Sequence, residues 1–122
     1  TEYLETTYRS IINQTLQNIE WIIVDDGSTN PEVKVLLTAL SQRTDKIRIL
    51  SHATHQGIAA SYNTAIAEAR GEYLCFVAIG SILDPTYLEK GALFLETHPQ
   101  VSVVNSYSIV FQAQEHWWQP NL

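Results

Sequence analysis

The stretch that decides the fold is EWIIVDDGST, which runs from Glu20 to Thr29. Its centre, Trp21 to Val24, is a short apolar run with β-branched side chains, a pattern typical of a strand buried on both faces. The run ends in two carboxylates, a glycine and two hydroxyls, from Asp25 to Thr29. Because parallel sheets bind ligands at the carboxyl ends of their strands, the sequence predicts a polar, ligand-facing edge here.

Alternating helical and strand-like segments extend outward from this stretch. Asn30 and Asp84 each precede a proline, which predicts a helix cap followed by the first helical turn. Gly71 stands where a glycine commonly ends a helix. The periodicity predicts helices at 2–16, 31–40, 57–69 and 84–97, and further strands at 47–50, 72–77, 101–104 and 107–111. This alternation predicts an α/β domain with a mainly parallel sheet covered on both faces.

The composition narrows the function classes. The 122 residues carry a formal charge of −6, with 45% apolar and 16% charged residues, which suits one globular domain. An acidic chain without clustered lysine or arginine argues against nucleic-acid binding. The single cysteine, Cys75, lies in an apolar run and is predicted to be buried. No apolar run approaches the about 20 residues of a membrane-spanning helix, so the expected location is the cytoplasm.

Two interpretations of the polar loop stay open from the residues alone. The Asp26 carboxylate can accept hydrogen bonds from a ribose or a base, and Gly27 permits a positive φ and close approach of the backbone. The same loop, continued to Pro31, is equally typical of a turn followed by a helix cap. Residue types therefore do not choose between a ligand site and a turn.

A longer series of ordered matches decides the interpretation. The matching residues are Tyr3, Leu4, Ser10, Ile11, Gln14, Thr15, 24–28, Gln56, Gly57, Asn63, Ala69, 71–74, 83–85, Leu88 and Glu89. In this order they resemble the family-2 glycosyltransferases, over most of residues 3–98. A lone Asp-Asp-Gly-Ser would be a weak signal, whereas the ordered set is specific.

The resemblance implies a fold and a ligand. The fold is the Rossmann-like GT-A fold, a three-layer α/β/α sandwich, and the ligand is a nucleoside-diphosphate sugar. The nucleotide-binding residues that the resemblance implies are Asp25, Asp26, Gly27, Ser28, Gly57 and Asn63. Asp26 would contact the base or the ribose, which requires its carboxylate to face an open pocket. Asn63 is equally well explained as an ordinary helix residue.

The sequence departs from the family at the metal site. The family places an Asp-x-Asp motif after the strand equivalent to residues 72–77, where carboxylates hold Mn²⁺ or Mg²⁺ against the leaving diphosphate. Ala78 and Gly80 occupy these positions, and Ser81 stands where a third acid often follows. Asp84 is interpreted as a helix cap and not as a replacement ligand. The chain is therefore expected to have no metal ligands, no cofactor and no catalytic residue.

Four other residues are given structural roles. His52 and His55 lack a third ligand at useful spacing and are interpreted as loop histidines. Trp117 and Trp118 lie in an aromatic, unpatterned tail at 116–120, and an edge or interface role is favoured over stacking on a sugar.

The family pattern also extends beyond both ends of this sequence. The opening strand of the family would lie before Thr1, and the acceptor and catalytic-base region beyond Leu122, so a single partial domain is expected over residues 1–122. Without a central strand, neighbouring edges are unpaired. The prediction is a rearranged sheet, a strand supplied by a second copy, or a chain cut from a longer protein. Two functions stay open: a glycosyltransferase part inactive alone, and a non-catalytic nucleotide-binding or protein-interaction module.

Overall fold

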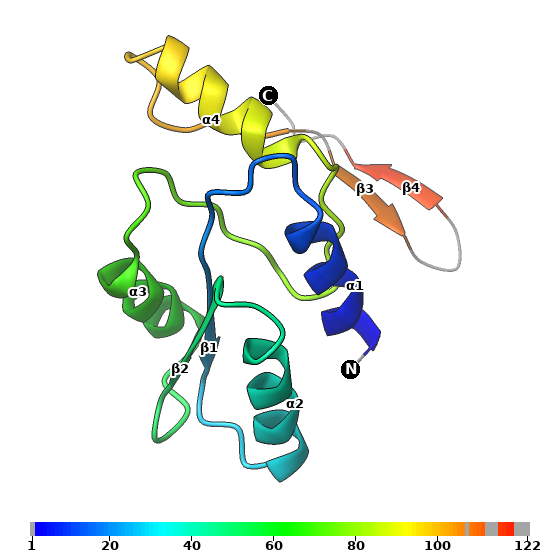
Figure 1. Ribbon diagram of the computed structural model, residues 1–122, viewed down its shortest axis with the longest axis vertical. Helices are drawn as coiled ribbons and strands as arrows, with labels where there is room; N and C mark the ends of the chain where they lie inside the picture. Colours follow the sequence, from blue (N-terminus) through cyan, green and yellow to red (C-terminus); the bar gives the residue numbers. More distant parts are fainter. Residues whose placement is uncertain (1, 107, 112–114, 119–122) are drawn as a thin grey trace.

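The computed structural model describes residues 2–106, 108–111 and 115–118. Figure 1 shows the elements in chain order: α1 (Glu2–Ile12), β1 (Trp21–Asp25), α2 (Pro31–Ser41), β2 (Ile47–Ser51), α3 (Ile58–Glu68), α4 (Tyr87–Thr97), β3 (Ser108–Phe111) and β4 (Glu115–Trp118). The described chain is therefore a mixed α/β structure. None of its described helices is long and apolar enough to cross a membrane.

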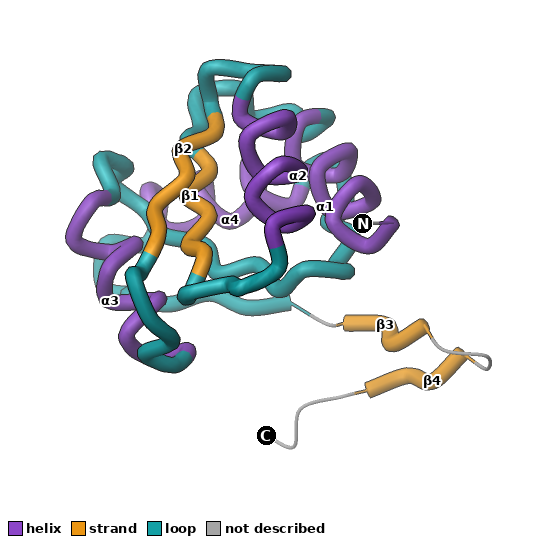
Figure 2. Tube along the Cα trace, turned by 90° about the horizontal axis from the view of Figure 1, so that it is seen from below, coloured by secondary structure: helices purple, strands orange, loops and turns teal. Residues whose placement is uncertain are grey.

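The strands form two separate two-stranded sheets. β1 and β2 are parallel, in a register that pairs Trp21 with Ile47 and Asp25 with Ser51. Both strands therefore end at the same edge, which is where the polar loops begin. β3 and β4 are antiparallel to each other and project away from the remaining elements (Figure 2).

The core lies on one face of the β1–β2 sheet. Leu4 of α1 and Leu37 and Leu40 of α2 are buried against Ile23 of β1 and Ile47 of β2. α3 packs against β1, and Figure 2 shows the two strands between α3 on one side and α1 and α2 on the other. The parallel pair thus has helices on both faces, as predicted, although only one face holds buried residues.

Local sequence signals explain the elements that agree with the prediction. Asn30 is the N-cap of α2, because its Oδ1 accepts the Glu32 N–H at 2.9 Å, and Pro31 begins the helix. β1 and β2 form over the expected apolar runs. The helix predicted to end near Thr97 also ends there.

α1 is shorter than the predicted helix at 2–16, because its last residues take other partners. The N–H of Thr15 donates to Pro85 O at 2.8 Å and so leaves the helical pattern. The Gln14 side chain donates to Asp84 O at 2.7 Å. Contacts with a segment about 70 positions away along the chain therefore end the helix at Ile12.

The predicted strands at 72–77 and 101–104 are wrong. Neither segment is a strand, and most of their residues are exposed. Cys75, predicted to be buried, is also exposed. An apolar run forms a buried strand only when another strand lies beside it, and among the described residues β1 pairs with β2 alone.

Three smaller predictions also need correction. α3 ends at Glu68 with Ala69 in an extended conformation, so Gly71 does not cap it. α4 begins at Tyr87, and Asp84 accepts the Thr86 N–H at 2.9 Å in the turn that precedes the helix. The tail predicted to be unpatterned contains β4, while Gln119, Pro120 and Tyr107 lie outside the described residues.

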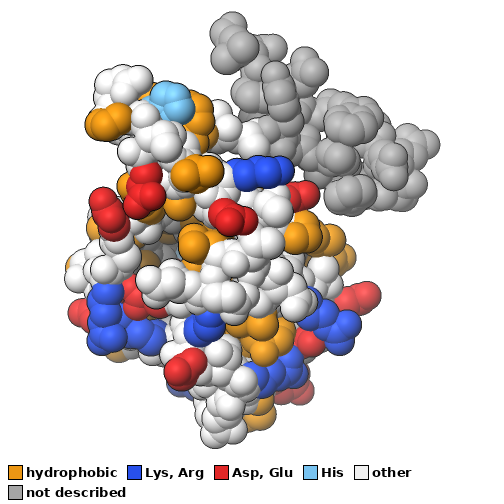
Figure 3. Space-filling view, turned by 45° about the horizontal axis from the view of Figure 1, so that its top comes forward, with side chains coloured by type: hydrophobic (Ala, Val, Ile, Leu, Met, Phe, Trp, Pro, Cys, Tyr) orange, Lys and Arg blue, Asp and Glu red, His pale blue; other side chains and the backbone are white. Residues whose placement is uncertain are grey.

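The hydrophobic stripe predicted for α3 is only partly covered. Tyr62 packs its ring edge-on against Phe76, with ring centroids 4.9 Å apart, yet both rings are exposed. α3 and α4 contain no buried residue. Hydrophobic side chains accordingly lie open on the surface among charged ones in Figure 3.

Candidate functional site

The candidate site is the edge at which β1 and β2 end. Asp26 follows β1 directly, and its carboxylate reaches the loop that follows β2. Oδ1 accepts a hydrogen bond from His52 Nδ1 at 2.6 Å and from the Gln56 N–H at 2.9 Å. Oδ2 accepts from the Gly57 N–H at 2.8 Å and lies 2.9 Å from Nδ1 of His55. One carboxylate therefore ties together the two loops of this edge.

These contacts change the acidity of Asp26. The hydrogen bond from His52, followed by that from the Gln56 amide, lowers the pKa of the Asp26 carboxyl from 3.8 to about 2. Each donor stabilises the ionised carboxylate. Asp26 is therefore a fixed negative charge at neutral pH.

His52 belongs to the site through its side chain, although sequence reasoning treated it as a loop residue. Its side chain is 8% exposed. While Nδ1 donates to Asp26, Nε2 lies 2.8 Å from the Thr64 hydroxyl on α3. His52 thus connects the end of β1 to α3. A sequence signal did exist, because parallel neighbouring strands bring the residues that follow them to one edge.

His55 differs from His52 in exposure. Its side chain is 81% exposed, although Nδ1 contacts the same carboxylate. The prediction that neither histidine belongs to a metal site is untested. Within the described residues, no group of three or more histidine, cysteine, aspartate or glutamate side chains is arranged to hold a metal ion.

Asp25 and Gly27 shape the turn after β1. Asp25 is buried, and its Oδ1 accepts the Ser28 N–H at 3.0 Å. Gly27 has a φ of 75°, and a Cβ there would lie 2.5 Å from the backbone nitrogen of His55. Only glycine fits both conditions. The close approach predicted at Gly27 is real, but the neighbour is the chain's own loop.

Gly57 and Asn63 mark the start and the outer surface of α3. Gly57 is the N-cap residue, with a φ of 98°, and no side chain caps the helix at this position. Its N–H is held by Asp26 instead. Asn63 is exposed. It takes no part in the Asp26 cluster, which is Asp26 with His52, His55, Gln56 and Gly57.

The structure thus brings five predicted residues together, Asp25 through Ser28 and Gly57, and leaves Asn63 apart. It adds His52, His55, Gln56 and Thr64. The Asp26 carboxylate faces these partners and not an open pocket, which counts against direct contact with a ligand. A nucleotide-binding role for any of these residues stays a prediction.

The residues at the family's metal position do not fit a metal ion. Ala78 and Gly80 offer no oxygen side chain, and Ser81 offers only a hydroxyl. Hard divalent cations prefer carboxylates and need several oxygen ligands. No reaction step through a metal is therefore assigned to this segment.

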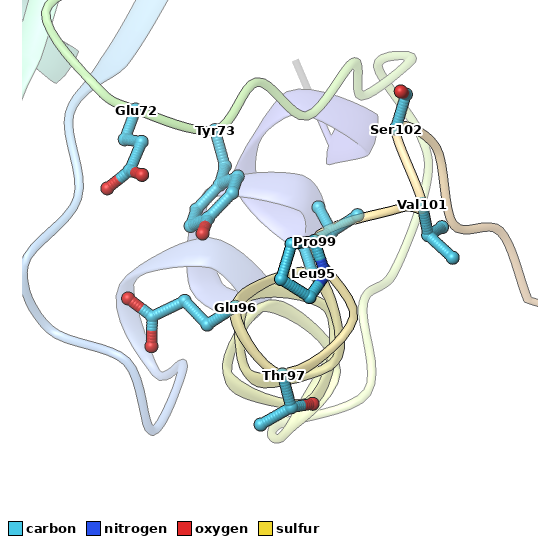
Figure 4. A pocket seen from close by; sticks show the side chains of 8 residues that line it. All are labelled: Glu72, Tyr73, Leu95, Glu96, Thr97, Pro99, Val101 and Ser102. Carbon is cyan, nitrogen blue, oxygen red and sulfur yellow. The ribbon is translucent and has the colours of Figure 1, made fainter.

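Two hollows in the described surface lie away from the carboxyl ends of β1 and β2. The larger, about 810 Å³, is lined by Glu72, Tyr73, Leu95, Glu96, Thr97, Pro99, Val101 and Ser102. In Figure 4 the carboxylates of Glu72 and Glu96 lie on the same side of the hollow as the Tyr73 ring. Partial desolvation of the ring, together with these two negative charges, raises the pKa of Tyr73. The other hollow lies between α1 and residues 82–85.

Fold and site together define a class of protein. A parallel pair of strands flanked by helices, with polar loops joined at the carboxyl edge, is typical of α/β domains that bind ligands at that edge. The family model described as Glycosyl transferase family 2 matches residues 1–122. The chain belongs to the glycosyl transferase family 2, and this membership implies the GT-A fold.

Similar curated proteins support the assignment. An uncharacterized glycosyltransferase of Haemophilus influenzae is 29% identical, over 93% of this chain and 35% of its own length. An uncharacterized glycosyltransferase of Nostoc sp. is 32% identical, over 88% of this chain and 33% of its own length. The glycosyltransferase GlyG of Streptococcus pneumoniae is 34% identical, over 72% of this chain and 29% of its own length. The chain thus spans about a third of each of these relatives.

Proposed function

We propose that this chain is the nucleotide-binding part of a glycosyltransferase that uses a nucleoside-diphosphate sugar, and that alone it transfers no sugar. The observation that carries the proposal is the Asp26 cluster. It fixes the loops after both parallel strands at the edge where α/β domains bind their ligands. Family membership supplies the class of ligand.

The proposed nucleotide site consists of Asp25, Asp26, Gly27, Ser28, Gly57 and Asn63. Both carboxylate oxygens of Asp26 already accept two contacts each from the protein. In this proposal Asp26 acts mainly by fixing the loops, because direct contact with a ribose would require it to release a partner. The partly exposed Ser28 and the exposed Asn63 offer a hydroxyl and an amide to the nucleoside.

The expected lack of activity follows from the charge of the leaving group. Sugar transfer releases a nucleoside diphosphate, whose developing negative charge needs a cation or fixed donors nearby. Ala78 and Gly80 leave this chain without the carboxylate pair that holds such a cation. The proposal therefore separates binding of the nucleotide from chemistry on it.

Calorimetry with uridine and guanosine diphosphates, with and without manganese, tests the proposal. We expect weak binding that manganese does not change, and loss of this binding in Asp26→Ala. The matched control is Asp45→Ala, an exposed aspartate before β2 at the opposite end of the sheet. Binding that requires manganese would contradict the account of Ala78 and Gly80. Absence of any binding would leave the protein-interaction module as the better function.

The proposal extends to the sheet itself. The Trp21 N–H donates to Lys46 O, and Asp25 O accepts the His52 N–H, so the backbone groups of these two residues face β2. Because neighbouring residues of a strand face opposite edges, the backbone groups of Ile22 and Val24 face the other edge of β1. Among the described residues no strand pairs with that edge. We propose that a strand from a second copy or from a longer parent chain completes a three-layer GT-A sandwich here. Sedimentation that shows a stable monomer at all concentrations would exclude the second copy.

A cytoplasmic location is part of the same proposal. Its support is the exposed thiol of Cys75, which suits a reducing compartment. Cell fractionation of the tagged protein tests it, and recovery in a membrane or secreted fraction would contradict it.

A further inference from the structure

Two polar side chains, Thr7 in α1 and Gln14 in the loop that follows it, are buried where apolar residues would be expected. Thr7 and Gln14 are each 1% exposed, as little as any residue of the core. Burial of a polar group is unfavourable unless it is hydrogen-bonded, so such residues need partners of matching geometry. Each side chain has partners that lie 70 to 74 positions further along the chain, between Gly80 and Leu88.

Thr7 holds the backbone at Gly80 and Ser81. Its Oγ1 accepts the Gly80 N–H at 2.8 Å. The hydroxyl hydrogen has two carbonyl acceptors in reach, Ser81 O at 3.0 Å and Tyr3 O in its own helix at 3.1 Å. Gly80 has a φ of 99°, which residues other than glycine rarely adopt, so this contact fixes a sharp change of chain direction.

Gln14 holds the segment at its other end. Its Nε2 donates to Asp84 O at 2.7 Å and to Ser10 O at 3.1 Å, which uses both amide hydrogens. Its Oε1 accepts the Leu88 N–H at 3.0 Å. That N–H belongs to the first turn of α4 and has no acceptor within the helix. The N-cap residue Thr86 makes no side-chain capping bond, so Gln14 caps α4 from the loop after α1.

We infer that Thr7 and Gln14 are positioning residues that hold segment 80–88 in one place against α1. Only the role of this segment beside the nucleotide rests on the proposed function. Apolar burial contributes little to its position, because no residue of the segment is fully buried and Ile82 is 61% exposed. α1 in turn packs through Leu4 in the core under β1. The two side chains therefore tie the segment to the sheet.

Amide hydrogen exchange tests the inference on the full chain. In the unaltered protein the Gly80 and Leu88 amides should exchange more slowly than that of Ile79. Thr7→Val keeps the shape and removes the hydroxyl, and should speed exchange at Gly80 about five- to tenfold relative to Ile23 in β1. Thr7→Ser restores the hydroxyl and should restore protection. Gln14→Met should likewise speed exchange at Leu88. Thr6→Val, on the outer side of α1, is the control and should leave both amides protected.

The outcomes separate the two proposals. Equal changes at Gly80 and at Ile23 would overturn the inference, because they would show a general loss of stability. Lack of protection at Gly80 and Leu88 in the unaltered protein would overturn it even if the variants fail to fold. The exchange data do not depend on nucleotide, so a failure of nucleotide binding would leave them standing. If nucleotide binds, Thr7→Val should weaken it and Thr7→Ser should not.

Discussion

The two halves of the described chain are held by different forces. Within residues 2–106, every buried residue lies between Leu4 and Ile47, in α1, β1, α2, β2 or the loop after α1. From residue 57 to residue 106 no described residue is buried, although the segment contains two helices and many apolar side chains. The first half is a packed core, and the second half is attached to it.

The attachments are polar. Asp26 holds the start of α3 through the Gly57 N–H, and Arg48 holds its end, donating to Glu68 O at 3.0 Å. Gln14 caps the start of α4. Hydrogen bonds have fixed directions, whereas apolar contacts do not, so a few of them define positions without a large buried area. In this molecule, apolar residues of the first half form the buried core, and a few polar residues fix the positions of the helices in the second half.

The largest test of this comparison is a pair of leucine substitutions. Leu40 is 2% exposed in α2, and Leu93 is 58% exposed in α4. Leu40→Ala should lower the free energy of unfolding by about 2–5 kcal/mol, because it leaves a cavity in the core. Leu93→Ala should change it by less than about 0.5 kcal/mol. Urea denaturation measures both, and similar losses would show that the second half has a core of its own.

A pair of glycine substitutions is the second test. Gly27→Ala would place a Cβ 2.5 Å from His55 N at a φ of 75°, and should cost about 1–3 kcal/mol. Gly91 lies within α4, and the nearest atom to its added Cβ is 3.9 Å away on Val104. Gly91→Ala should therefore stabilise by up to about 1 kcal/mol. The melting temperatures of the two variants should shift in opposite directions from that of the unaltered protein. A shift in the same direction would contradict the packing described at Gly27.

A pair of arginine substitutions tests the polar attachment of α3. Arg48 bonds Glu20, Glu68 and the end of α3, and its side chain is 26% exposed. Arg48→Met should cost about 1 kcal/mol and loosen α3. Arg9→Met removes an ion pair on the outside of α1 and should lower the free energy of unfolding by at most about 0.3 kcal/mol. If exchange of the α3 amides is unchanged in Arg48→Met, the attachment described here is wrong.

The smallest effect is expected in the acid range, at Asp26. Its pKa of about 2 in the folded chain lies below the ordinary 3.8, so folding favours the ionised form. The sign follows from linkage: this stability is complete above about pH 5 and is lost as the pH falls towards 2. Asp26→Asn lacks it throughout. Urea midpoints of the two proteins should therefore converge between pH 5 and pH 2, and a constant difference would contradict the low pKa.

Local signals were enough to predict most of the elements. Asn30 with Pro31 defines the start of α2, and the runs at Trp21 and Ile47 define the two parallel strands. These signals lie within a few residues of the element they specify. The same reasoning failed at 72–77, whose apolar run is equally β-like. Whether such a run becomes a strand depends on a partner from elsewhere in the chain.

The site was predictable only in part, for a related reason. The Asp-Asp-Gly-Ser sequence located the loop after β1. That Asp26 turns towards His52 and Gln56, some 26 to 30 positions away, follows from the parallel register and not from either loop. The burial of Thr7 and Gln14 was also beyond local reasoning, since polar side chains are ordinarily exposed to solvent.

The edge of β1 that pairs with no strand in the described part of the chain has a practical consequence for work with this protein. The strand reads WIIVD, with one charge in five residues and no proline or glycine, which is the composition of segments that stack into fibres. Two molecules that pair through Ile22 and Val24 would join their sheets edge to edge. Concentrated or slowly refolded samples should therefore turn cloudy before dilute ones. A lysine in place of Val24 would be the natural remedy for keeping the material in solution.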